Sequence, residues 1–109
     1  SSTKLLANKK AWRDPAKRKA IEEIMTLLLG VIEARGKVLL SMNVPEEKLA
    51  EIVAILPAMK NPTVSKLYNS GYYAVETVAP KKDVNILIPK LKEKGAQDIL
   101  EINISKIVK

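Results

Sequence analysis

Few residues in this 109-residue sequence could do chemistry, because cysteine and histidine are both absent. Without them the chain has no thiol or imidazole nucleophile, no disulfide and no Cys/His zinc pattern. The adjacent carboxylates Glu22/Glu23 and Glu46/Glu47 would point in different directions on a helix, which suits solvent better than acid–base catalysis. The glycines are isolated, and neither GxxxxGK[ST] nor GxGxxG occurs. The sequence therefore predicts no catalytic residue and no metal site.

The remaining polar positions favour binding of a small molecule. Asn43 lies at the end of a predicted strand, and Thr63 begins another strand after a proline-containing loop. We expect both to point toward a cleft at the strand ends, which Met59 and Val78 line. An amide, a hydroxyl and free backbone groups would suit a zwitterionic amino acid. The alternative is structural: Asn43 caps a helix, and Thr63 closes the turn that precedes it.

A long amphipathic helix is expected to lead into the part of the chain that carries these residues. Asp14-Pro15 is a typical helix start, and Gly36 a typical stop. Between them lies an apolar face formed by Ile21, Ile24, Met25, Leu28 and Ile32, which Leu27, Leu29 and Val31 widen. So wide an apolar arc predicts burial on two sides or contact with a further domain.

From Lys37 onward the pattern predicts an α+β fold of the ferredoxin-like type. Alternating or β-rich segments predict strands at 38–44, 63–68, 72–78 and 98–104. Pro45 and Pro80 each open a predicted amphipathic helix, the second of which ends before Gly95. The order βαββαβ predicts a four-stranded antiparallel sheet with two helices on one face.

The chain divides into three predicted parts. Residues 1–13 form a linker, residues 14–36 the connecting helix, and residues 37–109 the ferredoxin-like domain. Residues 4–7 could be the stub of a strand whose partners are missing, and the sequence begins with Ser1 rather than Met. We therefore expect a fragment of a longer protein, in which the linker is a remnant of a preceding domain.

The positive charge is concentrated at the start of the chain. Residues 1–20 hold seven cations and one anion, which accounts for most of the net charge of +7. Such an arm could bind nucleic acid, but a solvated linker and first helical turn is the favoured interpretation. Binding of RNA on the sheet is disfavoured, because Tyr72 and Tyr73 are adjacent and point to opposite faces instead of stacking two bases together.

No segment of the sequence predicts a membrane span or a signal sequence. The longest apolar stretch, 24–32, has nine residues and is too short to cross a bilayer. The first residues lack the basic and apolar regions of a secretory signal. We therefore expect a cytoplasmic setting.

Four segments, in order, resemble the C-terminal regulatory domain of long-form ATP phosphoribosyltransferase. They are 42–45 (MNVP), 56–64 (LPAMKNPTV), 71–75 (GYYAV) and 91–100 (LKEKGAQDIL). The resemblance implies a two-part catalytic body, followed by a ferredoxin-like domain that binds histidine as feedback inhibitor, in a hexamer. It also implies that the catalytic body uses Mg²⁺ with ATP and phosphoribosyl pyrophosphate, whereas this chain alone needs no cofactor and is non-catalytic.

Position by position, the resemblance implies that histidine contacts Asn43, Met59, Thr63, Val78 and Asp98. The Thr63 hydroxyl would hold part of the amino acid, while Met59 and Val78 pack against the imidazole. Asn43 stands where an acidic residue can pair with the cationic groups of the ligand. Asp98 stands at a position that is small in relatives, and its carboxylate would either supply the charge that Asn43 lacks or point away.

We therefore expect a histidine-sensing regulatory domain from the first enzyme of histidine biosynthesis. Its expected partners are L-histidine, the catalytic domains of the parent enzyme and further copies of itself. Self-association is expected because Leu39 and Leu67 make the open sheet face partly apolar among Ser41 and its polar neighbours. Two alternatives stay open: a nucleic-acid-binding module that uses the basic arm, and a purely structural oligomerisation domain.

Overall fold

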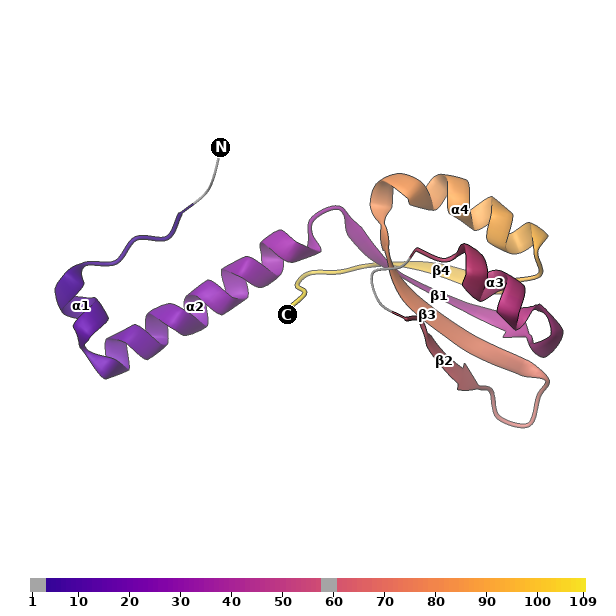
Figure 1. Ribbon diagram of the computed structural model, residues 1–109, viewed down its shortest axis with the longest axis horizontal. Helices are drawn as coiled ribbons and strands as arrows, with labels where there is room; N and C mark the ends of the chain where they lie inside the picture. Colours follow the sequence, from indigo (N-terminus) through magenta and orange to yellow (C-terminus); the bar gives the residue numbers. More distant parts are fainter. Residues whose placement is uncertain (1–3, 58–60) are drawn as a thin grey trace. The chain divides into compact units, whose positions relative to one another are not determined.

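The computed structural model describes residues 4–57 and 61–109, which form two compact units. One unit contains the residues up to Arg35 together with residues 105–109, and the other is Gly36–Ile104. Figure 1 shows the elements, which in chain order are α1 (Lys9–Arg13), α2 (Pro15–Ala34), β1 (Lys37–Pro45), the 3-10 helix η1 (Glu46–Lys48), α3 (Leu49–Ile55), β2 (Thr63–Lys66), β3 (Tyr72–Pro80), α4 (Lys81–Glu93) and β4 (Gln97–Asn103).

Helix α2 is the connecting helix that the sequence predicts. The Asp14 side chain accepts hydrogen bonds from two backbone N–H groups of the first turn, at 3.0 and 3.4 Å, and Pro15 is the first helical residue. The helix ends at Ala34, and Gly36 then adopts φ 69°, a conformation that glycine tolerates. Most of the apolar arc, including Leu29, is exposed within the described residues.

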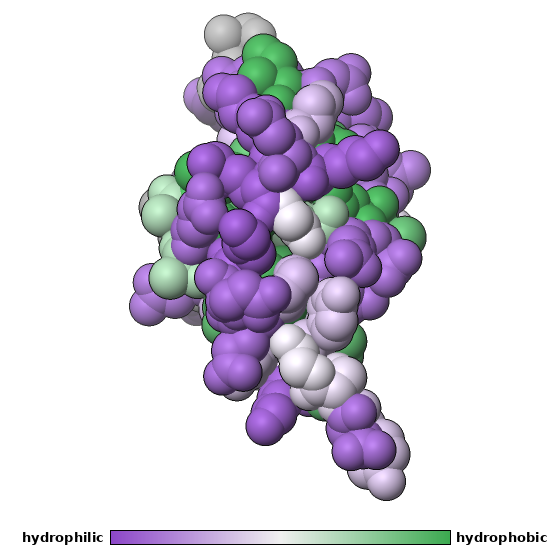
Figure 2. Space-filling view, turned by 90° about the vertical axis from the view of Figure 1, so that its right-hand side faces the viewer, coloured by the Kyte–Doolittle hydropathy of each residue, from purple (hydrophilic) through white to green (hydrophobic). Residues whose placement is uncertain are grey.

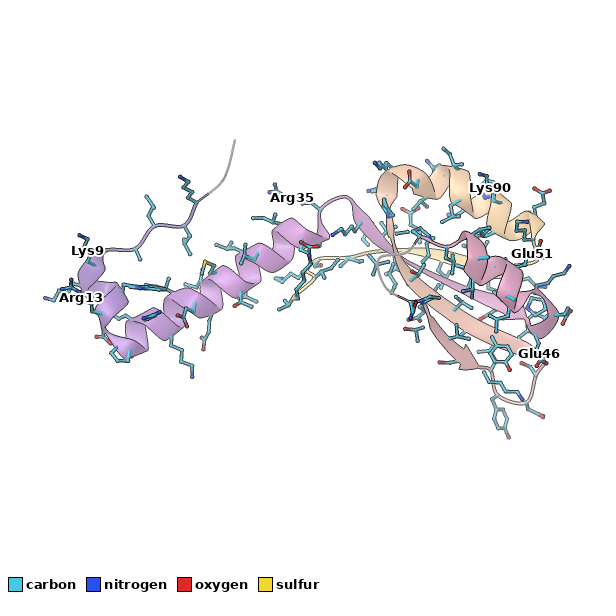
Figure 3. All side chains as sticks on the ribbon, viewed as in Figure 1. Lys9, Arg13, Arg35, Glu46, Glu51 and Lys90 are labelled. Carbon is cyan, nitrogen blue, oxygen red and sulfur yellow. The ribbon has the colours of Figure 1, made fainter. Side chains whose placement is uncertain are left out.

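The segment before α2 differs from the expectation of an irregular linker with a strand stub. Residues 4–8 have no regular structure, and the next five form helix α1. The Asn8 side chain caps this helix by accepting from the Ala11 N–H at 2.7 Å. Lys9 and Arg13, labelled in Figure 3, belong to α1, so part of the basic arm is helical. A helix of five residues is too short to show an apolar period, which is why the sequence analysis missed it.

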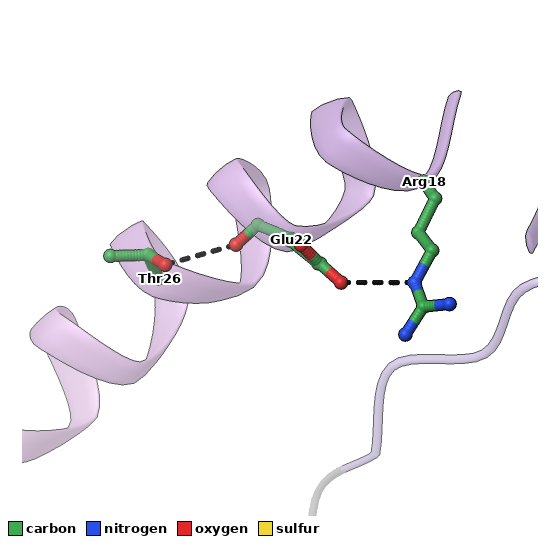
Figure 4. A network of polar contacts seen from close by, with 3 residues as sticks. All are labelled: Arg18, Glu22 and Thr26. Carbon is green, nitrogen blue, oxygen red and sulfur yellow. Dashed lines mark hydrogen bonds and ion pairs between the residues drawn. The ribbon is translucent and has the colours of Figure 1, made fainter. Parts of the chain in front are cut away.

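A small polar network connects α1 with α2. The Arg18 guanidinium lies 4.3 Å from the centre of the Trp12 ring, a cation–π geometry. Figure 4 shows that Arg18 Nε also donates to Glu22 Oε1 at 3.1 Å, and that Thr26 Oγ1 donates to the Glu22 backbone oxygen at 3.0 Å. At least one cation of the basic arm is therefore engaged within the chain.

Residues 36–104 confirm the predicted α+β, ferredoxin-like architecture. The strand order is β2-β3-β1-β4, and every neighbouring pair is antiparallel. Strand β1 alternates strictly, with Val38, Leu40, Met42 and Val44 buried. These side chains form one core with Ile52 of α3 and with Val84, Leu87 and Leu91 of α4, so both helices cover the same face of the sheet.

Several element boundaries differ from the prediction by one or two residues. Pro45 and Pro80 end β1 and β3 instead of opening a helix, and η1 and α4 begin at the next residue in each case. Strand β2 ends at Lys66 instead of residue 68, and the Leu67 N–H donates to the Tyr72 oxygen at 2.9 Å where the hairpin loop begins. A hairpin turn joins β2 to β3, with Asn69 as its left-handed residue at φ 47°.

The pairing register defines the face of the sheet that the helices leave open. Asn43 lies opposite Ala74 on β3 and opposite Gln97 on β4. Paired residues share a face, and alternate residues along a strand do too. The open face therefore carries Leu39, Ser41 and Asn43 of β1, Thr63 and Ser65 of β2, Tyr72, Ala74, Glu76 and Val78 of β3, and Gln97, Leu100 and Ile102 of β4.

Candidate functional site

Asn43 and Asp98 meet on the open face, where Asn43 Nδ2 donates to Asp98 Oδ2 at 3.0 Å. The contact depends on a bulge in β4. Ser41 pairs with Leu100 but Asn43 pairs with Gln97, so the register shifts between them. Asp98 itself has φ 50°, a left-handed conformation that is rare for residues other than glycine. Bulges change the direction of a side chain, and this one brings the carboxylate to Asn43.

The hydrogen bond between Asn43 and Asp98 determines which groups this pair presents to a ligand. An ionised carboxylate only accepts hydrogen bonds, so the Asn43 amide must turn its nitrogen toward Asp98. The amide oxygen of Asn43 then remains as an acceptor for another group. A carboxylate has about four acceptor positions, and the bond from Asn43 occupies one of them. The pair thus offers acceptors and one negative charge, which suits a cationic group with several N–H donors.

A second polar pair lies at the same end of the sheet. Gln97 Nε2 donates to the Tyr72 hydroxyl oxygen at 3.3 Å. Gln97 begins β4 and Tyr72 begins β3, and these two strands flank β1. Because neighbouring strands lie about 4.8 Å apart, the two side chains must reach over β1 near Asn43 to meet. Tyr72 and Gln97 therefore border the Asn43–Asp98 pair.

The structure separates two of the predicted site residues from this pair. Thr63 is exposed on β2 and pairs with Glu76, so two strand spacings separate it from β1. Val78 pairs with Leu39, which lies four residues from Asn43 along β1, or about 13 Å at the rise of a strand. Thr63 and Val78 share the open face with Asn43 but do not lie beside it.

The other site predictions have different outcomes. Met59 lies outside the described residues. Asn43 lies within β1 and bonds to Asp98, whereas the cap position of η1 is Pro45, which makes no side-chain hydrogen bond. The sequence analysis missed Gln97 as a site residue and treated Tyr72 only as a failed RNA-stacking residue. The signal that could have found Gln97 is its position next to Asp98 at the strand start.

Both polar and apolar side chains surround the site. A pocket of about 440 Å³ lies between the end of α4 and the start of β4, and its lining combines Ile88, Ala96 and Ile99 with Lys92, Gln97 and Asp98. Figure 2 looks onto the end of the sheet where β1 stops and β3 and β4 begin, and hydrophilic side chains cover most of that surface. A ligand here would remain in partial contact with water.

Two further kinds of site can be assessed across the described parts of the chain. In residues 4–57 and 61–109, no three or more aspartates and glutamates come together in a group that could bind a metal ion. None of the helices described here is both long and apolar enough to cross a membrane.

Fold and site together define a ferredoxin-like α+β domain whose open sheet face carries a charged polar cluster. Residues 34–106 match the family described as HisG, C-terminal domain, and the chain belongs to this family. It is 49% identical to ATP phosphoribosyltransferase of Pelotomaculum thermopropionicum, 48% to that of Pelodictyon phaeoclathratiforme and 46% to that of Chlorobium chlorochromatii, each over 99% of this chain. The chain spans 37% of the length of these relatives.

Proposed function

We propose that this chain is the regulatory domain of an ATP phosphoribosyltransferase and that it binds L-histidine as a feedback signal. Membership of the HisG C-terminal family and the identity to named ATP phosphoribosyltransferases support the parent enzyme. The observation that carries the proposed ligand site is the hydrogen-bonded pair of Asn43 and Asp98 on the open sheet face.

The pair matches the cationic part of histidine. The ammonium group, or a protonated imidazole, brings positive charge and N–H donors to the Asp98 carboxylate and to the Asn43 amide oxygen. Asp98 would thereby supply the negative charge that an asparagine at position 43 lacks. Contacts of the ligand with Met59, Thr63 and Val78 remain predictions.

The remaining features of the parent protein are also proposals. A catalytic part of the parent enzyme would join ATP to phosphoribosyl pyrophosphate with Mg²⁺. This chain would then regulate the reaction without taking part in it. Assembly into a homo-oligomer and a cytoplasmic location complete the proposal.

Isothermal titration calorimetry of the full chain with L-histidine tests the proposed site. We expect saturable binding, and we expect Asp98→Asn to weaken it about 10- to 100-fold, because hydrogen bonds to charged groups contribute about 1.5–3 kcal/mol. Asp83→Asn is the matched control, since Asp83 is an exposed carboxylate in the first turn of α4. Equal loss of affinity in both variants would indicate a general effect of net charge instead of a site.

Calorimetry with L-histidine and with an oligonucleotide separates the proposed function from the two alternatives. A nucleic-acid-binding module would bind an oligonucleotide with an affinity that falls steeply as salt rises, and would ignore histidine. A structural oligomerisation domain would bind neither. Absence of any histidine binding at millimolar ligand would therefore refute the proposal.

A further inference from the structure

We infer that Tyr72 and Gln97 form the half of the site that binds the carboxylate of the ligand. The inference rests on the proposed function, and it adds two binding residues to the proposed histidine site. With both halves the site would select a zwitterionic α-amino acid over a simple amine or a simple acid.

The hydrogen bond between the two side chains determines what they can offer. Gln97 Nε2 donates to the Tyr72 oxygen at 3.3 Å. A phenol both accepts and donates, so a Tyr72 that accepts from Gln97 keeps its own O–H for another acceptor. The amide nitrogen carries two hydrogens and uses one of them on Tyr72. The Tyr72–Gln97 pair thus presents donors, the opposite of what Asn43 and Asp98 present.

The register brings the two halves to the spacing of an amino-acid head group. Gln97 lies directly opposite Asn43, and directly opposed residues have Cβ atoms about 4.5–5.5 Å apart. Tyr72 lies opposite Pro45, two residues from Asn43 on the same face of β1. In an α-amino acid the ammonium and the carboxylate are attached to the same carbon. A single ligand of this class can therefore place its cation on Asp98 and its anion on the donors of Tyr72 and Gln97.

A structural role for the pair is the competing explanation. In that case the Tyr72–Gln97 bond would join the first residues of β3 and β4 over β1 and contribute only to stability. The two roles differ in one measurable respect. A binding role depends on the carboxylate of the ligand, whereas a structural role affects all ligands alike.

Titrations of the full chain with three ligands distinguish these roles. The ligands are L-histidine, L-histidinol, which lacks the carboxylate, and imidazolepropionate, which lacks the ammonium. We expect Tyr72→Phe to weaken L-histidine binding about tenfold, as for loss of one hydrogen bond to a charged group, and to leave histidinol binding unchanged. Asp98→Asn should weaken histidine and histidinol but not imidazolepropionate. Tyr68→Phe is the control, because Tyr68 is 95% exposed in the hairpin loop.

A second variant, Gln97→Leu, tests whether the effect of Tyr72→Phe comes from lost binding contacts or from a folding defect. Gln97→Leu removes the amide donor and should reproduce the ligand pattern of Tyr72→Phe, with circular dichroism confirming that each variant is folded. Equal weakening of histidine and histidinol by Tyr72→Phe, or no weakening of either, would overturn the inference. If Asp98→Asn still weakens histidine in that case, the proposed function stands without it. If the parent chain binds no histidine, both fail.

Discussion

Replacing Gly30 with alanine tests how the last five residues, 105–109, are held on α2. We call these residues the C-terminal strap. The Ile107 N–H donates to the Gly30 carbonyl oxygen at 2.9 Å. Gly30 is buried, and a Cβ atom there would lie 3.2 Å from Val108 Cγ2 and 3.5 Å from the Ile107 oxygen. The missing side chain of Gly30 therefore allows the backbone of the strap to approach the helix.

The expected change in the stability of α2 on Gly30→Ala is the sum of two opposing effects. Alanine in a helix interior is about 1 kcal/mol more favourable than glycine. In the intact chain the new methyl group would lie 3.2 Å from Val108 Cγ2, so the strap would have to shift slightly, and we expect weakening of the Ile107 hydrogen bond to cost up to about 1 kcal/mol. We therefore expect almost no net change in the stability of α2 in the intact chain. In a chain that ends at Ile104, Gly30→Ala should stabilise α2 by the full amount, about 1 kcal/mol.

Native-state hydrogen exchange measures this difference, because it reports the free energy of local opening at individual amides. The amides of the last turn of α2 report on the helix, and the amide of Ile107 reports on the strap. Glu23→Ala is the control, since Glu23 is exposed on α2 and lies about two turns before Gly30, the residue that bonds to the strap. This control should give the same change with and without residues 105–109.

One result would refute the reasoning. If Gly30→Ala stabilises α2 by the same amount in both backgrounds, the strap does not depend on the glycine. The ion pair between Lys109 Nζ and Glu33 Oε1, at 2.9 Å, could not rescue the argument. Its lysine is largely exposed, and such pairs contribute at most about 1 kcal/mol.

The remaining predictions concern charge, assembly and the ligand. The hydrogen bond from Lys94 Nζ to Glu51 Oε1, at 3.0 Å, lowers the pKa of Glu51 (Figure 3) below its ordinary value of 4.5. The ion pair between Lys94 and Glu51 therefore stabilises the folded chain at pH values above 4.5, and this contribution is lost as the pH falls through the lowered pKa of Glu51. An NMR titration of Lys94→Met should show the pKa of Glu51 rise, and an unchanged pKa would contradict this cause. Leu29→Glu, at a side chain 57% exposed on α2, should shift a self-associating chain toward monomer in sedimentation, and a parent that is monomeric at millimolar concentration would contradict the expectation. Because Asn43 and Asp98 are in contact, exchanging the two residues should retain most of the histidine affinity in calorimetry, whereas a loss as large as that of Asp98→Asn would show that the charge must come from β4.

The predictable parts of the fold are those that local rules decide. Asp14-Pro15 supplies both a side-chain cap and a preset φ, so the start of α2 follows from two adjacent residues. The alternation of β1 places Val38 and Val44 in the core in the same way. Helix α1 escapes such rules because it has five residues and buries none of them. The strap escapes them because its contact with Gly30 joins segments far apart in the sequence.

The site was predictable only in part, for a related reason. The resemblance pointed to Asn43 and Asp98 separately, but their contact depends on a bulge and on φ 50° at Asp98. A non-glycine residue gives little sign in the sequence that it will adopt a left-handed conformation. The contact of Tyr72 with Gln97 depends on the strand order, which places the starts of β3 and β4 on either side of β1.

The contact between Asn43 and Asp98 also suggests how such a site can keep its charge when its residues change. The Coulomb attraction of a ligand cation depends on its distance from the negative charge and on the local dielectric, not on which strand bears the carboxylate. Two side chains 3.0 Å apart can therefore exchange the roles of acid and amide with little change in the field at the ligand. The bulge in β4 is what makes this exchange possible, because a regular strand would not bring the carboxylate of residue 98 to β1 in this way.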